Sequence, residues 1–164
     1  MPRLLILEFL YWSLKDALRP MKKIESPDPV INPEKLQIWM VGHATMLINF
    51  YGTTILTDPV FGKWLPFPRR IVGPGFKIKQ LPKLDFILQS HMHWDHFHTR
   101  TIKKIPKKDT TILLPEDCSD LTDDMGFKKV IEMKPGDVRT EAGVRVTTYR
   151  PHHWGKRVPW EKQQ

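Results

Sequence analysis

The chain has 164 residues, of which 40% are hydrophobic and 27% charged, a composition typical of one globular domain rather than a disordered or fibrous chain. The net charge of +8 comes from short, scattered basic pairs and not from a block of like charges. We therefore expect a solvated basic surface and no nucleic-acid partner. The single cysteine, Cys118, excludes an intrachain disulfide and fits a reducing, cytoplasmic location.

The first 34 residues are predicted to form an N-terminal helix and a proline-rich linker, ahead of a domain that spans residues 35–164. Residues 4–18 have helical periodicity, and the helix is expected to end before Pro20. This apolar stretch is too short to cross a bilayer and has no A-x-A cleavage site. Two interpretations remain open: a helix docked on the domain, or a peripheral helix that lies on anionic lipid.

The domain is predicted to begin with strands. Residues 37–41 and 45–50 have strand composition, and residues 53–57 follow the turn at Tyr51-Gly52. Residues 59–75 contain four prolines and read as a long irregular loop, where functional residues are common. Arg69 and Arg70 lie in this loop; a solvated surface pair and a phosphate contact are the two interpretations.

Strands and short helices then alternate. Strands are expected over residues 85–89, 110–114, 128–133 and 144–149, and helices over 99–105 and 116–125. Hairpins followed by alternating elements predict an α+β fold with a layered, mixed sheet and flanking helices, and not an all-parallel sheet.

The most specific signal is the motif H-x-H-x-D-H at residues 91–96, directly after the apolar run at residues 86–88. Two histidines separated by one residue, at the end of a strand, can both turn their imidazoles toward one cation. Asp95 and His96 then project toward a second cation. Neutral imidazole and carboxylate suit Zn²⁺, with Fe or Mn as alternatives. A further histidine pair, His152-His153, follows the strand predicted over residues 144–149, where another ligand would be expected.

On these motifs the sequence resembles the metallo-β-lactamase superfamily, and within it the lactonase-like branch that includes the N-acyl-phosphatidylethanolamine phospholipases D. The resemblance runs in family order from about residue 35 to the end of the chain. It rests on four segments: residues 39–45 (W-x-V-G-H-A-T), 55–59 (I-L-T-D-P), 90–96 (S-H-M-H-W-D-H) and 151–154 (P-H-H-W).

The resemblance implies a fold and a set of metal ligands. The fold would be an αββα sandwich. The chain is expected to supply mainly its first half and is interpreted as a truncated form. His91, His93 and His153 would bind the first metal, and Asp95 and His96 the second. The family's bridging Asp and final His cannot be placed after His153. The expected zinc content is therefore about one equivalent, with up to two sites of which one is incomplete.

Other polar residues near these motifs have weaker assignments. His43 follows Gly42 at a strand end, where either an indirect role beside the metals or a structural hydrogen bond is expected. Asp58 would orient a ligand histidine through its other ring nitrogen, or cap a turn. His98 is interpreted as a solvent-facing residue at a helix start, and the residues that contact substrate are unknown.

The leading functional hypothesis is a metal-dependent hydrolase in which a metal-activated water attacks an ester carbon or phosphorus and Asp95 helps to move the proton. By resemblance the substrate is a small-molecule or lipid phosphodiester, with a lactone or other ester as alternatives. The rival hypothesis is a catalytically incomplete fragment that binds a complementary chain supplying the missing half, or that has lost function.

Overall fold

The computed structural model describes residues 2–62, 70–150, 152 and 153. Arg69, Pro151 and Trp154, which the sequence motifs include, lie outside these residues. The elements in chain order are α1 (Pro2–Leu18), β1 (Leu36–Gly42), β2 (Thr45–Phe50), β3 (Thr53–Thr57), the 3-10 helix η1 (Ile78–Gln80), β4 (Phe86–Leu88), α2 (Thr99–Ile102), β5 (Thr111–Pro115), the 3-10 helix η2 (Ser119–Thr122), β6 (Lys129–Met133), β7 (Val138–Glu141) and β8 (Val144–Thr147).

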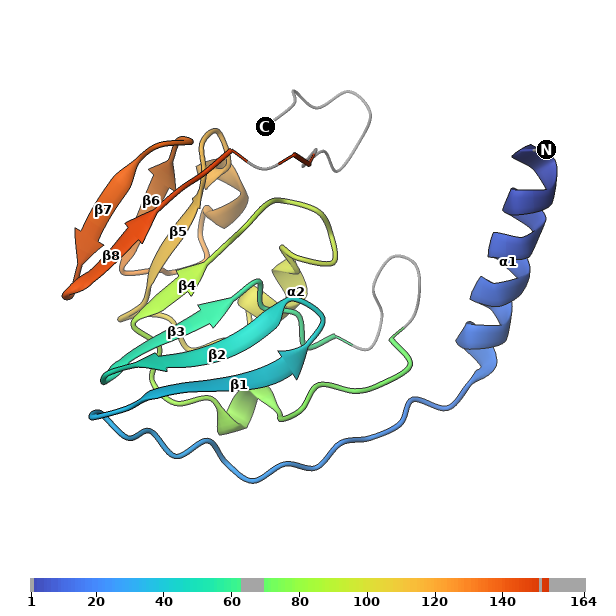
Figure 1. The fold of residues 1–164 in the computed structure, drawn as a ribbon, viewed down its shortest axis with the longest axis horizontal. Helices are drawn as coiled ribbons and strands as arrows, with labels where there is room; N and C mark the ends of the chain where they lie inside the picture. The colour runs from blue at the N-terminus through green and yellow to red at the C-terminus, as the bar shows by residue number, and fades with distance from the viewer. Residues whose placement is uncertain (1, 63–69, 151, 154–164) are drawn as a thin grey trace.

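The centre of the fold is a six-stranded sheet in the order β1-β2-β3-β4-β5-β6, beside which β7 and β8 form a separate hairpin (Figure 1). β2 pairs antiparallel with β1 and β3, and the pairs from β3 to β6 are parallel. Every strand except β2 in this sheet therefore runs in the same direction. The carboxyl ends of β1, β3 and β4 consequently meet at one edge, and the expected mixed sheet with flanking helices is confirmed.

Apolar side chains cover both faces of the sheet at its central strands β3, β4 and β5. This explains why β3, β4 and β5 read as continuous apolar runs and not as alternating strands. One core lies on the side of the short helices, and the other lies under the β7–β8 hairpin. The first includes Leu56, Ile87, Ile112, Phe97 and Ile102; the second includes Ile55, Phe86, Leu113, Met133 and Val144.

The β7–β8 hairpin corrects the predicted strand over residues 144–149, which ends at Thr147 and has a partner that the sequence prediction missed. The turn between the strands is formed by Ala142 and Gly143, with φ of 47° and 79°. Two consecutive positive φ values are the mark of the tight turns that match strand twist. β7 was missed because its residues are mostly exposed and polar.

The predicted helix over residues 116–125 is wrong, because only the 3-10 turn η2 forms there. Asp117 and Asp124 have φ of 58° and 57°, which no helix accommodates. The Glu132 side chain accepts hydrogen bonds from the backbone N–H of Cys118 (2.9 Å) and Ser119 (2.7 Å). A carboxylate from β6 thus satisfies the N–H groups at the start of η2, which have no acceptor within the short helix.

α1 is not docked on the sheet, since Figure 1 shows it well apart from the strands. Apolar side chains are exposed around the helix and not along one stripe, among them Leu7, Phe9, Leu10, Tyr11, Trp12 and Leu14. Among the described residues, no helix has both the length and the apolar character needed to cross a membrane. The boundary between residues 34 and 35 stays a prediction, although the backbone of Lys22 bonds to Ile71 and Gly73.

The outer strand β1 also keeps apolar side chains in solvent. Leu36, Ile38 and Met40 alternate along it and are 50%, 59% and 65% exposed. They share one face because side chains two apart in a strand point the same way. This part of the sheet lies beyond the residues that pack under the hairpin.

Shortening a buried side chain of β4 tests the account of the core. Ile87 is fully buried in the centre of the sheet, so Ile87→Ala is expected to lower the free energy of unfolding by about 2–5 kcal/mol. The control is Ile38→Ala, which removes the same atoms from an exposed strand position and is expected to change it by less than about 0.5 kcal/mol. Urea unfolding measures both, and equal losses would contradict the assigned core.

Candidate metal centre

Three strand ends bring the polar residues of the sequence motifs to one edge of the sheet. His43 follows β1, Asp58 follows β3, and the loop that carries His91 follows β4. Because these strands run in the same direction, side chains far apart in the sequence meet there. His153 reaches the same edge from the segment after β8, and its ring lies 5.0 Å from that of His91 between centroids.

Asp58 is the centre of a buried hydrogen-bond network at this edge. Its carboxylate accepts bonds from the Gln89 side chain (2.9 Å), the Ser90 backbone N–H (2.7 Å) and the Ser90 hydroxyl (2.5 Å). The same carboxylate lies 2.8 Å from His96 Nδ1. Asp58 is only 5% exposed, and its own N–H donates to Leu88 O. It thereby joins the end of β3 to the whole histidine loop.

Threonine hydroxyls fix the turn that carries His43. Thr45 Oγ1 donates to Asp58 O (2.6 Å) and accepts from Val60 N–H (3.0 Å), and Thr57 Oγ1 donates to Ala44 O (2.8 Å). Hydroxyls can donate and accept at once, so each ties two backbone segments together. The turn after β1 and the turn after β3 therefore form one rigid unit.

Arg70 is a structural residue and not part of a solvated surface pair. Its side chain is buried and donates to Val60 O (2.9 Å) and Gly42 O (3.2 Å). Burial lowers the pKa of its guanidinium. With both bonds directed to carbonyls, Arg70 braces the turn beside His43; its sequence neighbour Arg69 lies outside the described residues.

His91, His93 and His153 form the first group in which side-chain nitrogens converge. His93 Nδ1 lies 3.0 Å from His91 Nε2 and 3.3 Å from His153 Nε2. Zn–N bonds of 2.0–2.1 Å in a tetrahedron separate the ligand atoms by about 3.3–3.4 Å. Three imidazole nitrogens at this spacing fit one Zn²⁺ and leave its fourth position open.

His43, Asp95 and His96 form the second group. His43 Nε2 lies 2.9 Å from Asp95 Oδ2, and His96 Nε2 lies 3.8 Å from the same oxygen. The rings of His91 and His96 are 4.0 Å apart between centroids, so the two groups are neighbours. Ligand atoms of Asp58, His91 and His96 also lie within 4.8 Å of one another, but the Asp58 oxygens already accept several hydrogen bonds.

The electrostatic environment keeps the imidazoles of His91 and His93 neutral. Burial, followed by the nearby His96 and His93, lowers the pKa of His91 to about 4. Burial and then His153 lower the pKa of His93. A histidine must be neutral to donate a lone pair to a cation, so the site holds these residues ready for binding near neutral pH.

Asp95 is held ionised. Burial opposes this, but a hydrogen bond from its own backbone N–H and the charges of His96 and His43 outweigh it and keep the pKa of Asp95 below its usual value. An ionised carboxylate accepts protons and binds cations. Asp95 is therefore available for either role at neutral pH.

His98 lies outside both groups. It is the residue before α2, as predicted for a helix start, but it is half-buried and not solvent-facing. Its Nδ1 lies 2.7 Å from Thr101 Oγ1, and a Cβ added at Gly62 would lie 2.6 Å from its ring. His98 thus packs the loop after β3 against α2.

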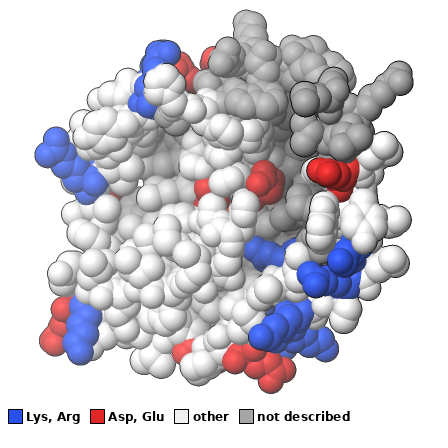
Figure 2. Space-filling view, turned by 45° about the vertical axis from the view of Figure 1, so that its right-hand side comes forward, with Lys and Arg blue, Asp and Glu red and all other residues white. Residues whose placement is uncertain are grey.

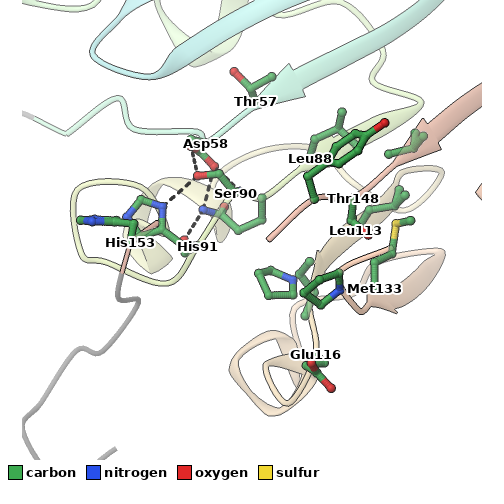
Figure 3. A pocket seen from close by; sticks show the side chains of 16 residues that line it. Thr57, Asp58, Leu88, Ser90, His91, Leu113, Glu116, Met133, Thr148 and His153 are labelled. Carbon is green, nitrogen blue, oxygen red and sulfur yellow. Dashed lines mark hydrogen bonds between the residues drawn. The ribbon is translucent and has the colours of Figure 1, made fainter. Parts of the chain in front are cut away.

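A cavity of about 440 Å³ opens beside the first histidine group (Figure 3). Figure 3 shows the polar residues Asp58, Ser90, His91 and His153 at one end and apolar side chains at the other. The apolar lining comes from β4, β5, β6 and β8. Its members include Leu88, Leu113, Met133 and Val146.

The surface charge is dispersed on the face shown in Figure 2. Uncharged side chains cover most of this face, and Lys and Arg side chains lie in separate groups, some at its left edge and others in its lower right part. On the residues drawn there, the net charge of +8 does not form a continuous basic band of the kind that tracks a nucleic-acid backbone.

In comparisons with known proteins, residues 37–164 match the family described as "Beta-lactamase superfamily domain". The N-acyl-phosphatidylethanolamine-hydrolyzing phospholipase D 1 of Caenorhabditis elegans is 34% identical over 95 residues, which are 55% of this chain and 26% of the relative. A UPF0173 metal-dependent hydrolase of Haloquadratum walsbyi is 31% identical over 113 residues, 68% of this chain and 43% of the relative.

Among solved structures, a possible metal-dependent hydrolase from Veillonella parvula superposes with a TM-score of 0.57 at 20% identity. The superposition covers 66% of this chain and 45% of that protein. At this identity it shows a shared fold. The chain spans about a quarter of the nematode relative and less than half of the other two proteins.

Replacing the carboxylate that contacts His96 tests the network. Asp58→Asn keeps the size of the side chain but removes its charge, so we expect zinc affinity to fall about 10–100-fold, as for other residues that orient metal ligands. The control is Asp109→Asn, at an exposed position where the carboxylate pairs with Lys83 at 3.4 Å; its zinc affinity should be unchanged. Competition with a chromophoric chelator measures both, and identical affinities would contradict the role assigned to Asp58.

Proposed function

Because this chain belongs to the metallo-β-lactamase superfamily, we propose that it is a metal-dependent hydrolase whose centre is built on His91, His93 and His153. The supporting observation is the convergence of three imidazole nitrogens from two separate loops, 3.0 and 3.3 Å apart at His93 Nδ1. Neutral nitrogens at this distance repel one another unless a proton or a cation lies between them. A divalent cation uses all three at once.

The donor set favours zinc. Three imidazoles with an open fourth position are a catalytic zinc arrangement, and Fe or Mn suits the neighbouring carboxylate-containing group equally well. When bound, such a cation lowers the pKa of water toward neutrality and polarises the oxygen of the bond to be broken.

The chain's own residues would do the remaining work. Asp95 is ionised and lies within reach of His43 and His96, so it is placed to accept a proton from the attacking water and to release it later. Asp58 holds His96 in a fixed orientation through Nδ1. The bonds to Ser90 and Gln89 fix the loop, which keeps the reacting groups in place.

We propose a substrate with an apolar portion next to the hydrolysed bond. The cavity of about 440 Å³ has His91 and His153 at one end, and the rest of its lining is mainly apolar side chains from four strands, with Glu116 and Thr148 as polar members. A lipid phosphodiester has this polarity, and the nematode relative is named for hydrolysing N-acyl-phosphatidylethanolamine. Lactones and other esters with an apolar tail fit the same description.

A second candidate function is a partner-binding half without catalysis. The apolar side chains of Leu36, Ile38 and Met40 are at least half exposed on β1. Surfaces of this kind mark protein–protein contacts. A complementary chain covering β1 would explain them, and folded protein that binds zinc but hydrolyses no ester would favour this role over the first.

We also propose that α1 contacts lipid. Its exposed Phe9, Tyr11 and Trp12 are the amphipathic and aromatic residues that favour a membrane interface, and Lys15 lies 4.7 Å from the Trp12 ring. Arg19, Lys22 and Lys23 follow the helix and would favour anionic headgroups. Such contact would bring the apolar cavity close to a lipid substrate.

The metal proposal predicts the outcome of removing one imidazole. His93→Ala is expected to lose the zinc bound by the three-histidine centre and to reduce hydrolysis of a chromogenic phosphodiester to background. The control is His152→Ala, which removes an exposed imidazole beside the centre and should keep both. Elemental analysis after dialysis and an absorbance assay are the measurements. The same zinc content in parent and His93→Ala protein would end the proposal.

The lipid proposal predicts weaker binding to vesicles when α1 becomes polar. A Trp12→Ser, Leu14→Ser double variant is expected to float less with phosphatidylglycerol-containing vesicles, by about tenfold or more for two large apolar groups. Val30→Ser, at an exposed linker position, serves as the control and should float like the parent. Flotation of parent and double variant to the same extent would reject lipid contact through α1.

A further inference from the structure

His43 joins a group of potential metal ligands in which the sequence motifs alone place only Asp95 and His96. All three side chains offer ligand atoms that lie within 4.8 Å of one another. His43 Nε2 is 2.9 Å from Asp95 Oδ2, and the rings of His43 and His96 are 5.0 Å apart between centroids. His43 lies 52 residues before Asp95 in the chain, so only the fold brings them together.

The backbone at His43 is held in an uncommon conformation. Its φ is 57° and that of Gly42 is 126°, directly after a register shift between Met40 and Gly42 in the β1–β2 pairing. The left-handed region is uncommon for residues other than glycine, although histidine is enriched there. Arg70 stabilises the turn by donating to Gly42 O. The turn thus places the imidazole of His43 against Asp95.

The other members of the group are oriented as metal ligands. His96 Nδ1 lies 2.8 Å from the Asp58 carboxylate, which leaves Nε2 directed to the side of Asp95, 3.8 Å away. A carboxylate behind the imidazole is the usual support of a metal-binding histidine. Asp95 Oδ2 lies between the two imidazoles, at distances that bracket the separation of about 3.3–3.4 Å between ligands of tetrahedral zinc.

The exposure and the chemistry of the group also fit a cation. The His43 and Asp95 side chains are 38% and 40% exposed, so water or substrate can reach the remaining coordination positions. Two imidazoles and one carboxylate form a ligand set used for zinc, iron and manganese. The two histidine groups lie side by side, since the rings of His91 and His96 are 4.0 Å apart between centroids.

We propose that His43 is a direct ligand of the second divalent cation, and that it completes a three-residue site with Asp95 and His96, which the family resemblance already assigns to that cation. The inference deepens the proposed hydrolase function and rests on it. It raises the expected zinc content from about one equivalent, the number expected without His43, to about two. Its alternative is that His43 only donates a hydrogen bond to Asp95.

Substitution by asparagine separates these roles. Asn in His43→Asn keeps an N–H donor for Asp95, tolerates a positive φ and is a poor zinc ligand. Parent protein dialysed against zinc is expected to retain about two equivalents and His43→Asn about one. The matched control His98→Asn changes a histidine outside both groups at a helix start that accepts Asn, and it should retain about two. Elemental analysis measures the zinc, and far-ultraviolet circular dichroism verifies the fold.

A cysteine variant supplies an independent readout that needs no hydrolytic activity. With cobalt in place of zinc, His43→Cys is expected to retain about two equivalents and to gain a sulfur-to-cobalt charge-transfer absorption in the near ultraviolet. Such a band requires a direct bond between residue 43 and the metal. Parent protein should lack the band, because its only cysteine, Cys118, is buried away from both groups.

Each outcome decides between the proposals. Two equivalents in His43→Asn, or no charge-transfer band in folded His43→Cys, would show that His43 is not a ligand. One equivalent in parent protein that disappears in His93→Ala would overturn the second site and leave the three-histidine centre intact. Zinc content that His93→Ala leaves unchanged would instead overturn the proposed hydrolase centre.

Discussion

The buried Asp58 carboxylate is the interaction on which the candidate site depends. It accepts hydrogen bonds from Ser90 and Gln89 and contacts His96, so it connects the end of β3 to the loop after β4. A carboxylate that is 5% exposed is costly to bury unless it is well paired. The network satisfies this requirement and, in doing so, fixes the ring of His96 and the loop residues Gln89 and Ser90. The geometry of the site therefore follows from a requirement of the core.

The parallel arrangement of strands determines what meets at that edge. β1, β3 and β4 run in one direction, so the turns that carry His43, Asp58 and His91 lie together although they are far apart in the sequence. Threonines 45 and 57 and Arg70 then bind these turns to one another through backbone carbonyls and amides. Rigid support of this kind is what keeps ligand atoms apart by the distances that a cation needs. The cavity beside His91 adds an apolar site at the same edge.

Much of the fold was predictable where local signals are strong. The strands around residues 38, 47 and 55 follow from β-branched and aromatic runs that end at Gly42, Tyr51-Gly52 and Asp58-Pro59. The metal-binding motif at residues 91–96 can be recognised from the spacing of its residues alone. The prediction of a helix over residues 116–125 is wrong because Asp117 and Asp124 adopt a left-handed backbone conformation. The distant Glu132 also binds backbone N–H groups of this segment, which local propensity does not reveal. The interpretation of Arg69 and Arg70 as a solvated surface pair is wrong for Arg70 for a related reason, since its carbonyl partners are brought to it only by the folded chain. For His43 the sequence predicts only an indirect role or a structural hydrogen bond. Its contact with Asp95 depends on the strand order and on the register shift at the end of β1, which no local pattern reveals.

The central claim is that the imidazoles of His91, His93 and His153 share one cation. Diffraction from zinc-loaded crystals, recorded above and below the zinc absorption edge, tests it most directly. The account predicts an anomalous peak about 2.0–2.1 Å from a ring nitrogen of each of the three residues. A peak located elsewhere, or a zinc-loaded chain in which His153 points away from His91 and His93, would contradict it.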